Sequence, residues 1–206
     1  VELPAHGAAF LQQLIGPGQR LPDASFDQVL AQVPASRLPA HPLISREAAD
    51  RLRHARGQSL PDWLALRSGQ FEVFPDGVAF PQTPAQVREL LEWAAAQEAV
   101  VIPYGGGTSV AGHINPQPGR RPVLTVSLVR MNQLLELDRD SQIATFGPGA
   151  NGPQVESQLR AHGYTLGHFP QSWELSTLGG WVASRSSGQQ SLRYGRIEQL
   201  FAGGRL

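Results

Sequence analysis

Three consecutive glycines stand between a short apolar run and two hydroxyl side chains. The segment from Tyr104 to Ser109 reads YGGGTS and comes directly after the apolar residues 100–103. Glycine accepts positive φ angles and lets the backbone approach a ligand with no side chain in the way. Successive N–H groups in such a turn form a concave nest that binds phosphate oxygens. The segment therefore predicts a pyrophosphate site, although a surface turn without a ligand can have the same composition.

Two common nucleotide-binding motifs do not match this loop. Residues 107–112 have the glycine spacing of a P-loop, but His113 and Ile114 follow where a P-loop needs lysine and then serine or threonine. A Rossmann fingerprint that starts at Gly105 needs another glycine where Val110 stands, and then a helix rather than the prolines that follow. A phosphate bound here would have no helix N-terminus behind it.

A second segment, residues 167–188, combines hydroxyl side chains with glycines and reads GHFPQSWELSTLGGWVASRSSG. Gly179 and Gly180 fall in a helical stretch, where each costs about 1 kcal/mol relative to alanine. Such a cost indicates close approach to another backbone or to a ligand. Hydroxyls and amides at a helix start suit a phosphate group. Tight packing of a helix on a sheet is the alternative explanation.

Composition excludes several classes of chemistry. The 17 basic and 17 acidic residues cancel, which argues against a broad surface for nucleic acid or anionic membrane. Every basic residue is arginine and there is no cysteine, so lysine Schiff bases, disulfides and thiolate nucleophiles are ruled out. The six histidines lack metal-ligand spacing, so no metal site is predicted. No apolar run approaches the roughly 20 residues that span a bilayer.

The elements that must position the glycine loop include one parallel crossover. Thr83 can cap a helix, Pro84 suits its first position and Gln86 can complete a capping box. One buried helical face is expected at Val87, Leu90, Leu91 and Ala94. With a strand on either side of this helix, residues 78–103 are expected to form a strand–helix–strand unit with parallel strands.

The remaining patterns predict an α+β fold. Strands are expected at residues 71–74, 77–80, 100–103, 123–128, 134–137 and 143–146, the first two joined by a turn at Pro75-Asp76-Gly77. Helices are expected near residues 10–15 and 26–30, from Ser45 to about Arg56, from Asn151 through Leu159, and from a cap at Ser176-Thr177 through Val182. We expect residues 1–44 to be an arm on the main domain, which takes in residues 45–206.

Taken together, these segments resemble the FAD-linked oxidases that have a vanillyl-alcohol-oxidase (PCMH) type FAD-binding domain. The resemblance is closest to the branch with alkyldihydroxyacetonephosphate synthase and D-lactate dehydrogenase. The matching stretches are DGVAFPQTPAQV, VVIPYGGGTSVAG, GHFPQSWELSTLGGWVASRSSG and RYGRIEQL. Two long motifs in the right order, about 65 residues apart, are far more specific than one glycine cluster.

The resemblance implies that FAD lies extended between two α+β subdomains. The implied FAD contacts are Pro103, Tyr104, Gly105, Gly106, Gly107, Thr108 and Ser109 in the first motif, and Gln171, Ser172, Trp173, Glu174, Leu175, Ser176, Thr177, Ser184, Arg185, Ser186 and Ser187 in the second. The synthase is expected to have an acidic residue where this chain has Gln171, which leaves the role of that position open. Some relatives attach FAD to a histidine in a glycine loop. Thr108 follows the glycines here, so noncovalent FAD is expected.

Other polar residues have two interpretations each. His113 and His168 are candidates for ligand contact or for ordinary loop positions, and Arg185 for pyrophosphate contact or a surface ion pair. Trp173 and Trp181 also suit packing. No catalytic base is identified, so the catalytic residues are unknown. The resemblance places the substrate cap, its catalytic residues and the last part of the FAD site beyond Leu206, and we expect both ends of this chain to be boundaries within a longer protein.

The leading hypothesis is the FAD-binding portion of an oxidoreductase that oxidises a 2-hydroxy acid or related alcohol, with hydride transfer to flavin N5. An alkyl-glycerone-phosphate synthase without net redox change is the close alternative, and a non-catalytic nucleotide-binding or interaction module is an alternative of another class. We expect a cytoplasmic protein with a small-molecule substrate, no nucleic-acid partner and no membrane span, and a homodimer is compatible with these expectations. This chain alone is expected to be inactive.

Overall fold

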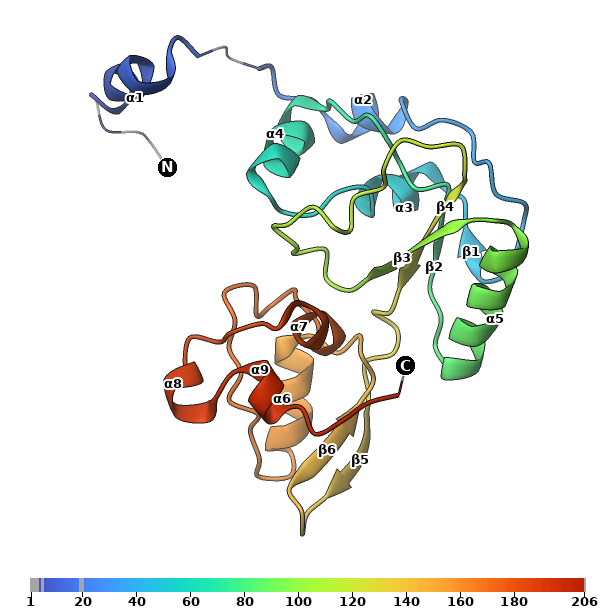
Figure 1. Cartoon of the computed structure of the whole chain (residues 1–206), viewed down its shortest axis with the longest axis vertical. Coiled ribbons are helices and arrows are strands. Elements are labelled where there is room, and N and C mark those ends of the chain that lie inside the picture. The colour runs from blue at the N-terminus through green and yellow to red at the C-terminus, as the bar shows by residue number, and fades with distance from the viewer. Residues whose placement is uncertain (1–3, 5, 19–20, 206) are drawn as a thin grey trace.

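The computed structural model describes residues 4, 6–18 and 21–205. In chain order the elements are α1 (Gly7–Ile15), α2 (Phe26–Leu30), β1 (Ile44–Ser45), α3 (Ala48–Arg53), α4 (Leu60–Ser68), β2 (Gly77–Ala79), α5 (Pro84–Ala96), β3 (Val100–Tyr104), β4 (Val123–Ser127), β5 (Leu134–Asp138), β6 (Ile143–Phe146), α6 (Gly152–Arg160), α7 (Leu178–Ser184), α8 (Ser191–Tyr194) and α9 (Ile197–Leu200). Figure 1 shows two parts, one from α2 to β4 and the other from β5 to α9.

The first part is built on a four-stranded sheet in the order β1-β2-β4-β3. β2 and β3 both run parallel to β4, so the predicted strand–helix–strand unit is confirmed, with β4 inserted between its two strands. β1 pairs with β2 in the antiparallel direction. Tyr104 at the end of β3 lies opposite Ser127 at the end of β4. The glycine loop therefore leaves the sheet at the shared carboxyl edge of two parallel strands.

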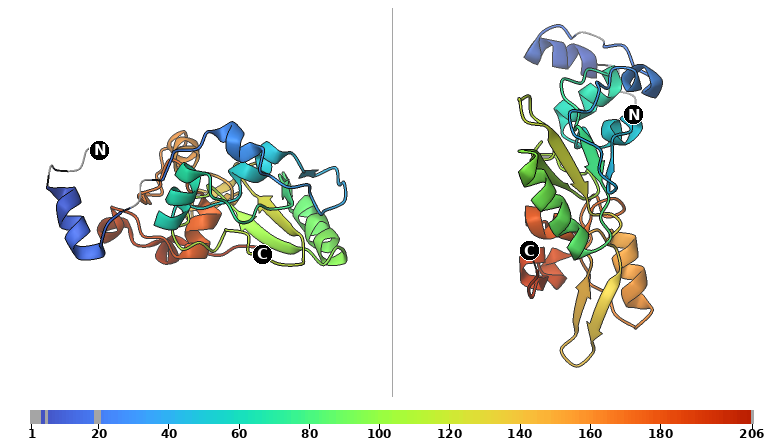
Figure 2. Two further views of the ribbon diagram at one scale, coloured as in Figure 1. Left: turned by 90° about the horizontal axis from the view of Figure 1, so that it is seen from above. Right: turned by 90° about the vertical axis from the view of Figure 1, so that its right-hand side faces the viewer.

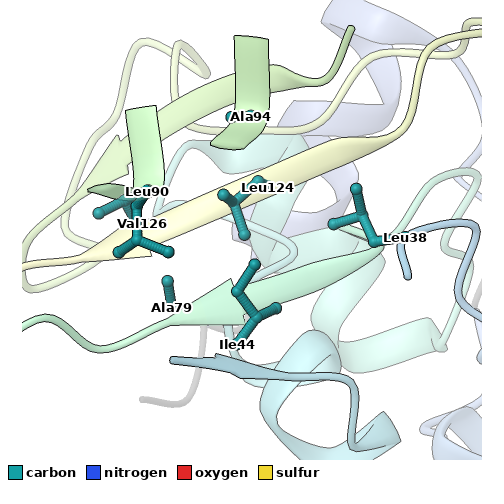
Figure 3. Close-up of a cluster of buried hydrophobic side chains, with 7 residues drawn as sticks. All are labelled: Leu38, Ile44, Ala79, Leu90, Ala94, Leu124 and Val126. Carbon is teal, nitrogen blue, oxygen red and sulfur yellow. The ribbon is translucent and has the colours of Figure 1, made fainter. Parts of the chain in front are cut away.

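Helix α5 covers one face of this sheet. The Thr83 hydroxyl accepts a hydrogen bond from Gln86 N at 3.2 Å, as the cap predicts. A capping box would need the Gln86 side chain to accept from Thr83 N. It accepts instead from Gln82 N, one residue earlier, at 2.7 Å, so the expected capping box is wrong. Leu90 and Ala94 are buried against side chains of the sheet, shown in Figure 3. Leu91 is 49% exposed, against expectation, because it lies about 100° round the helix from Leu90 and misses the sheet.

The second part has its own apolar core. Its buried residues are Ala150, Val155, Leu159, Trp181 and Ile197, with side chains of the β5–β6 ribbon packed against them. Helix α6 starts where the sequence predicts, because Asn151 and Gln154 form a reciprocal capping box. The strands expected at residues 123–128, 134–137 and 143–146 are also confirmed as β4, β5 and β6.

The strand expected at Phe71–Phe74 is wrong. The two rings stack with centroids 5.3 Å apart, and Phe74 is buried among Val29, Leu52 and Ala55. Aromatic residues favour strands because they fit half-buried surfaces, and an irregular segment can offer the same environment. Residues 75–77 therefore do not join two strands as a hairpin turn.

Asp76 is a buried anchor rather than an exposed turn residue. Its carboxylate accepts from Arg37 Nη2 at 2.7 Å and from Val123 N at 2.8 Å. Burial is the largest influence on the pKa of Asp76 and acts to raise it, but the hydrogen bonds outweigh it and the pKa is lowered. Asp76 therefore fastens the start of β4 to the chain before β1.

The helix expected from Ser45 begins later and ends earlier, as α3. Ser45 belongs to β1, and its hydroxyl donates to the Asp50 carboxylate at 2.6 Å instead of capping a helix. Glu47 stands at the cap position without a side-chain hydrogen bond. Ser45, which the sequence pattern assigned to the helix cap, instead pairs with β2 as part of β1.

The N-terminal residues divide into two unlike segments. Helix α1 buries no side chain and stands away from the rest of the chain in Figures 1 and 2. Val29 and Leu38, in contrast, are buried in the apolar clusters of the first part. Of the described part of the expected arm, the segment with Val29 and Leu38 lies against the main body and α1 does not, and the boundary at residue 45 stays a prediction. Within the described residues, no helix has the length and apolarity needed to cross a membrane.

Candidate functional site

The glycine loop lies where the two parts of the molecule meet. A Cβ atom on Gly106 would overlap the carbonyl group of Leu175, and one on Gly105 would overlap the Thr177 side chain. Gly107 has a φ of 68°. In Figure 1, α7 lies on the side of the second part that faces the first part, which contains β3. The structure therefore brings together the two motifs that the sequence separates by about 65 residues.

The side chain of Tyr104 packs against the glycine loop from the protein interior. A Cβ atom on Gly107 would overlap the Tyr104 hydroxyl, which donates to the carbonyl of Arg53 at 3.4 Å. Burial raises the pKa of Tyr104, so the phenol stays protonated. The imidazole of His54 packs on the Tyr104 ring with centroids 4.7 Å apart. Tyr104 thus fixes the loop through packing, with its ring turned away from solvent.

Thr177 and Ser176 build the start of α7. Gly180 N donates to the Thr177 hydroxyl at 3.4 Å, so the predicted cap is confirmed. The Ser176 hydroxyl accepts from Trp181 Nε1 at 2.7 Å and donates to the carbonyl of Ser172 at 2.8 Å. Both side chains are buried. They hold the second motif against the first.

The expected close approach at Gly179 is confirmed. Gly179 N donates to the carbonyl of Pro148 at 2.8 Å, and a Cβ atom on Gly179 would stand 2.9 Å from that oxygen. Asn151 Nδ2 also donates to the carbonyl of Glu174 at 3.2 Å. From the sequence, Asn151 was expected only to start a helix, although residues 147–151 read GPGAN and contain two glycines.

Exposure divides the predicted FAD contacts into two groups. Tyr104, Gly107, Ser176 and Thr177 are buried and shape the backbone. The contacts that solvent reaches at least in part are Pro103, Gly105, Gly106, Thr108, Ser109, Gln171, Ser172, Trp173, Glu174, Leu175, Ser184, Arg185, Ser186 and Ser187. A ligand at the junction would therefore meet backbone amides, hydroxyls, the guanidinium of Arg185 and the carboxylate of Glu174.

Free donors at this junction suit a polyanionic cofactor. In the part of the chain that is described, no acceptor is assigned to the backbone N–H of Gly106, Gly107 or Thr108. The indole Nε1 of Trp173 also has no acceptor among those residues, but it packs against Gly152 at the start of α6. Successive free N–H groups in a glycine turn form a nest that can bind anion oxygens. This donor set fits the phosphates and the polar ring edge of FAD.

His168 lies inside the second motif and is 1% exposed. Its Nε2 is 3.2 Å from the Ser186 hydroxyl, and its ring packs on Trp181 with centroids 5.0 Å apart. Burial lowers the pKa of His168, which favours the neutral ring. His168 therefore supports Ser186 from inside the protein.

Arg185 ends α7 in a left-handed conformation with a φ of 52°. Its side chain is 77% exposed and its Nη2 lies 3.4 Å from the Glu198 carboxylate. The surface ion pair considered for Arg185 is therefore present, and its exposure leaves the guanidinium within reach of a ligand. His113 is exposed, with Nδ1 3.1 Å from the Ser109 hydroxyl.

Neither a metal-binding group nor the surface hollow described next offers an alternative site in the described residues. Among residues 4, 6–18 and 21–205, no group of three or more histidine, aspartate or glutamate side chains is placed to hold a metal ion. A surface hollow around His41 and Arg46 contains none of the predicted FAD contacts. The glycine junction is therefore the candidate site.

Comparison with known proteins identifies the family. Residues 75–206 match the family described as FAD binding domain. The chain belongs to this FAD-binding family. It is 41% identical over 150 residues to alkyldihydroxyacetonephosphate synthase of Dictyostelium discoideum, an alignment that covers 73% of this chain and 24% of that protein. It is 29% identical over 126 residues to glycolate oxidase subunit GlcD of Bacillus subtilis, covering 61% of this chain and 26% of that protein.

A solved structure of alkyldihydroxyacetonephosphate synthase has a TM-score of 0.74 to this chain at 36% identity, covering 86% of this chain and 34% of that one. The resemblance, the α+β fold of the PCMH-type FAD-binding domain and FAD as cofactor are thereby confirmed. The chain spans about a quarter, 24%, of the length of the Dictyostelium relative. The individual FAD contacts stay predictions.

Proposed function

We propose that the FAD pyrophosphate binds noncovalently at the glycine loop and that the second motif contacts the ribityl chain and the flavin. The observation that supports this most is the contact between Gly106 and Leu175, which joins the two predicted motifs in one surface. Free N–H groups from Gly106 to Thr108 supply the donors for phosphate oxygens. Bound FAD would supply the redox-active ring, and these residues would orient it.

For the whole protein, we infer a flavoenzyme whose substrate cap and catalytic residues lie outside this chain. The higher identity, 41%, favours an alkyldihydroxyacetonephosphate synthase reaction without net redox change. Oxidation of a 2-hydroxy acid with hydride transfer to flavin N5 is the second candidate, and relatives named glycolate oxidase, D-lactate dehydrogenase and D-2-hydroxyglutarate dehydrogenase favour it. Gln171, where we expected an acidic residue in the synthase, counts against the first candidate.

Anaerobic spectroscopy of the intact protein separates the two reactions. Loss of the oxidised flavin absorbance on adding D-lactate, glycolate or D-2-hydroxyglutarate would support the oxidase reaction. Formation of alkyldihydroxyacetonephosphate with no lasting change in flavin absorbance would support the synthase. Intact protein that contains FAD but does neither would overturn both proposals for the reaction, while leaving FAD binding in place.

A further inference from the structure

The chain that follows the glycine loop is fastened at both ends to one short segment before α4. Gln58 N donates to the carbonyl of Ser109 at 2.7 Å, and Gly57 N donates to Asn115 Oδ1 at 2.9 Å. A Cβ atom on Gly57 would stand 2.5 Å from the Ser109 carbonyl oxygen, so only glycine allows this approach. Residues 109–115 therefore form a loop whose ends are both held by residues 57 and 58.

Asp62 completes this attachment from the first turn of α4. One oxygen, Oδ1, accepts from Asn115 Nδ2 at 2.6 Å, and the other accepts from Ser59 N at 3.0 Å and from Ser59 Oγ at 2.6 Å. The side chain is 2% exposed. Burial, the largest influence, acts to raise the pKa of Asp62, but the hydrogen bonds outweigh it and the pKa is lowered. The carboxylate is therefore ionised and fully engaged near neutral pH.

Apolar packing does not explain the position of α4. Asp62 is its only buried residue, while Leu60, Trp63 and Leu64 are 74%, 56% and 51% exposed. The helix is connected to the loop through a polar pair, 53 residues apart in sequence, rather than through a core face. The Ser59 contacts alone would cap the helix. The additional hydrogen bond to Asn115 connects α4 to residues 109–115.

We propose that Asp62 and Asn115 are positioning residues for FAD: they hold residues 109–115, and with them the end of the glycine loop, in the FAD-binding conformation before FAD arrives. This inference rests on the proposed binding of FAD at the glycine loop. A loop that is ordered in advance loses less conformational freedom when the ligand binds. Breaking the pair transfers that ordering cost to the binding step and weakens the affinity for FAD.

Exchange of the two side chains gives a specific test in the intact protein. Asp62→Asn places an amide nitrogen against the Asn115 amide or against the Ser59 donors. Asn115→Asp places two carboxylates where Asp62 and Asn115 now lie 2.6 Å apart. The exchanged double variant Asp62→Asn/Asn115→Asp restores one donor and one acceptor at the contact, and the carboxylate introduced at position 115 can still accept from Gly57 N.

FAD dissociation constants and melting temperatures of the apoprotein are measured for all four proteins. We expect each single variant to bind FAD about tenfold or more weakly and the exchanged variant to recover most of that loss. Lower melting temperatures with unchanged FAD affinity would overturn the inference and leave a purely structural role. If the single variants do not fold, Gly57→Ala decides: weaker FAD binding in that variant supports positioning, and affinity equal to the parent overturns it.

Gly57→Ala provides a second test without changing either partner, because its Cβ atom would push against the Ser109 carbonyl. Gly119→Ala is the matched control, since a Cβ atom there meets nothing within 4 Å. We expect weaker FAD binding for the first variant only, and equal affinities would overturn the inference. Gly106→Val tests the proposed FAD site separately from the positioning role of Asp62 and Asn115. If this variant binds FAD as tightly as the parent, the proposed FAD site itself is wrong.

Discussion

The α-carbon of Gly106 lies so close to the carbonyl group of Leu175 that any side chain at position 106 would overlap that oxygen. Gly106 belongs to the part of the molecule with the four-stranded sheet, and Leu175 to the part with α7. The glycine is therefore required by the protein's own packing as well as by the proposed ligand. Loop shape and the joining of the two parts cannot be changed separately at this position.

Gly106→Ala is therefore expected to affect both FAD binding and stability. Insertion of one methyl group against a backbone carbonyl costs about 1–3 kcal/mol. We expect a lower melting temperature for the apoprotein and an FAD dissociation constant raised about tenfold or more. Fluorescence titration and thermal unfolding of the intact protein measure the two effects, with Gly119→Ala as the control. An unchanged FAD affinity would show that the loop is only a turn.

FAD is expected to be released by denaturation, because Thr108 stands where a covalently flavinylated glycine loop has histidine. Precipitation of the intact protein with acid should leave all flavin absorbance in the supernatant. Flavin that stays with the pellet would show a covalent attachment, and digestion followed by mass spectrometry would then locate the modified residue.

Arg185→Gly is expected to stabilise the apoprotein while weakening FAD binding. A left-handed conformation costs a residue other than glycine about 1–2 kcal/mol, and the exposed ion pair with Glu198 offsets less than that. Gln142→Gly is the matched control, because Gln142 has a φ of 56° in the β5–β6 connection. Both variants should unfold at higher denaturant concentration. Only Arg185→Gly should bind FAD more weakly, and equal affinities would remove Arg185 from the set of FAD contacts.

Buried His168 and half-buried His54 predict a loss of stability in mild acid. Burial lowers the pKa of His168 and of His54 from the ordinary value of 6.5, so the unfolded chain binds protons more readily. Their contribution is fully present above pH 6.5 and is lost as the pH falls through the lowered values. Urea unfolding of the apoprotein at several pH values should show this loss. The dependence should become shallower in His168→Gln than in the parent.

Local capping is the part of the fold that the sequence predicts best. Thr83, Asn151 and Thr177 each accept from an N–H group three residues later, and such short-range contacts leave a readable pattern. Phe71 misled because an aromatic residue favours a strand and a stacked loop equally. The prediction for Ser45 was wrong because this residue pairs with Val78 of β2, a contact that the local sequence does not show.

The candidate site was predictable only in part for the same physical reason. The two glycine motifs could be found separately, and the family resemblance indicated that they act together. Asp62 and Asn115 meet across 53 residues, and nothing local marks either one as a partner of the loop. The role of residues 147–151 was missed, although their glycines gave a signal that could have been followed.

The two parts of the molecule have no apolar cluster in common, which has a consequence for how the chain melts. Clusters of the first part include the one with Leu90 and Leu124, the second part has the one with Val155 and Trp181, and no cluster extends across both parts. Each part can define its own cooperative unit, so the apoprotein is expected to lose its structure in two calorimetric transitions. A cofactor that touches both glycine motifs binds only when both units are folded, so it should merge the transitions. The width of the temperature gap that closes would then measure how strongly FAD couples the two halves.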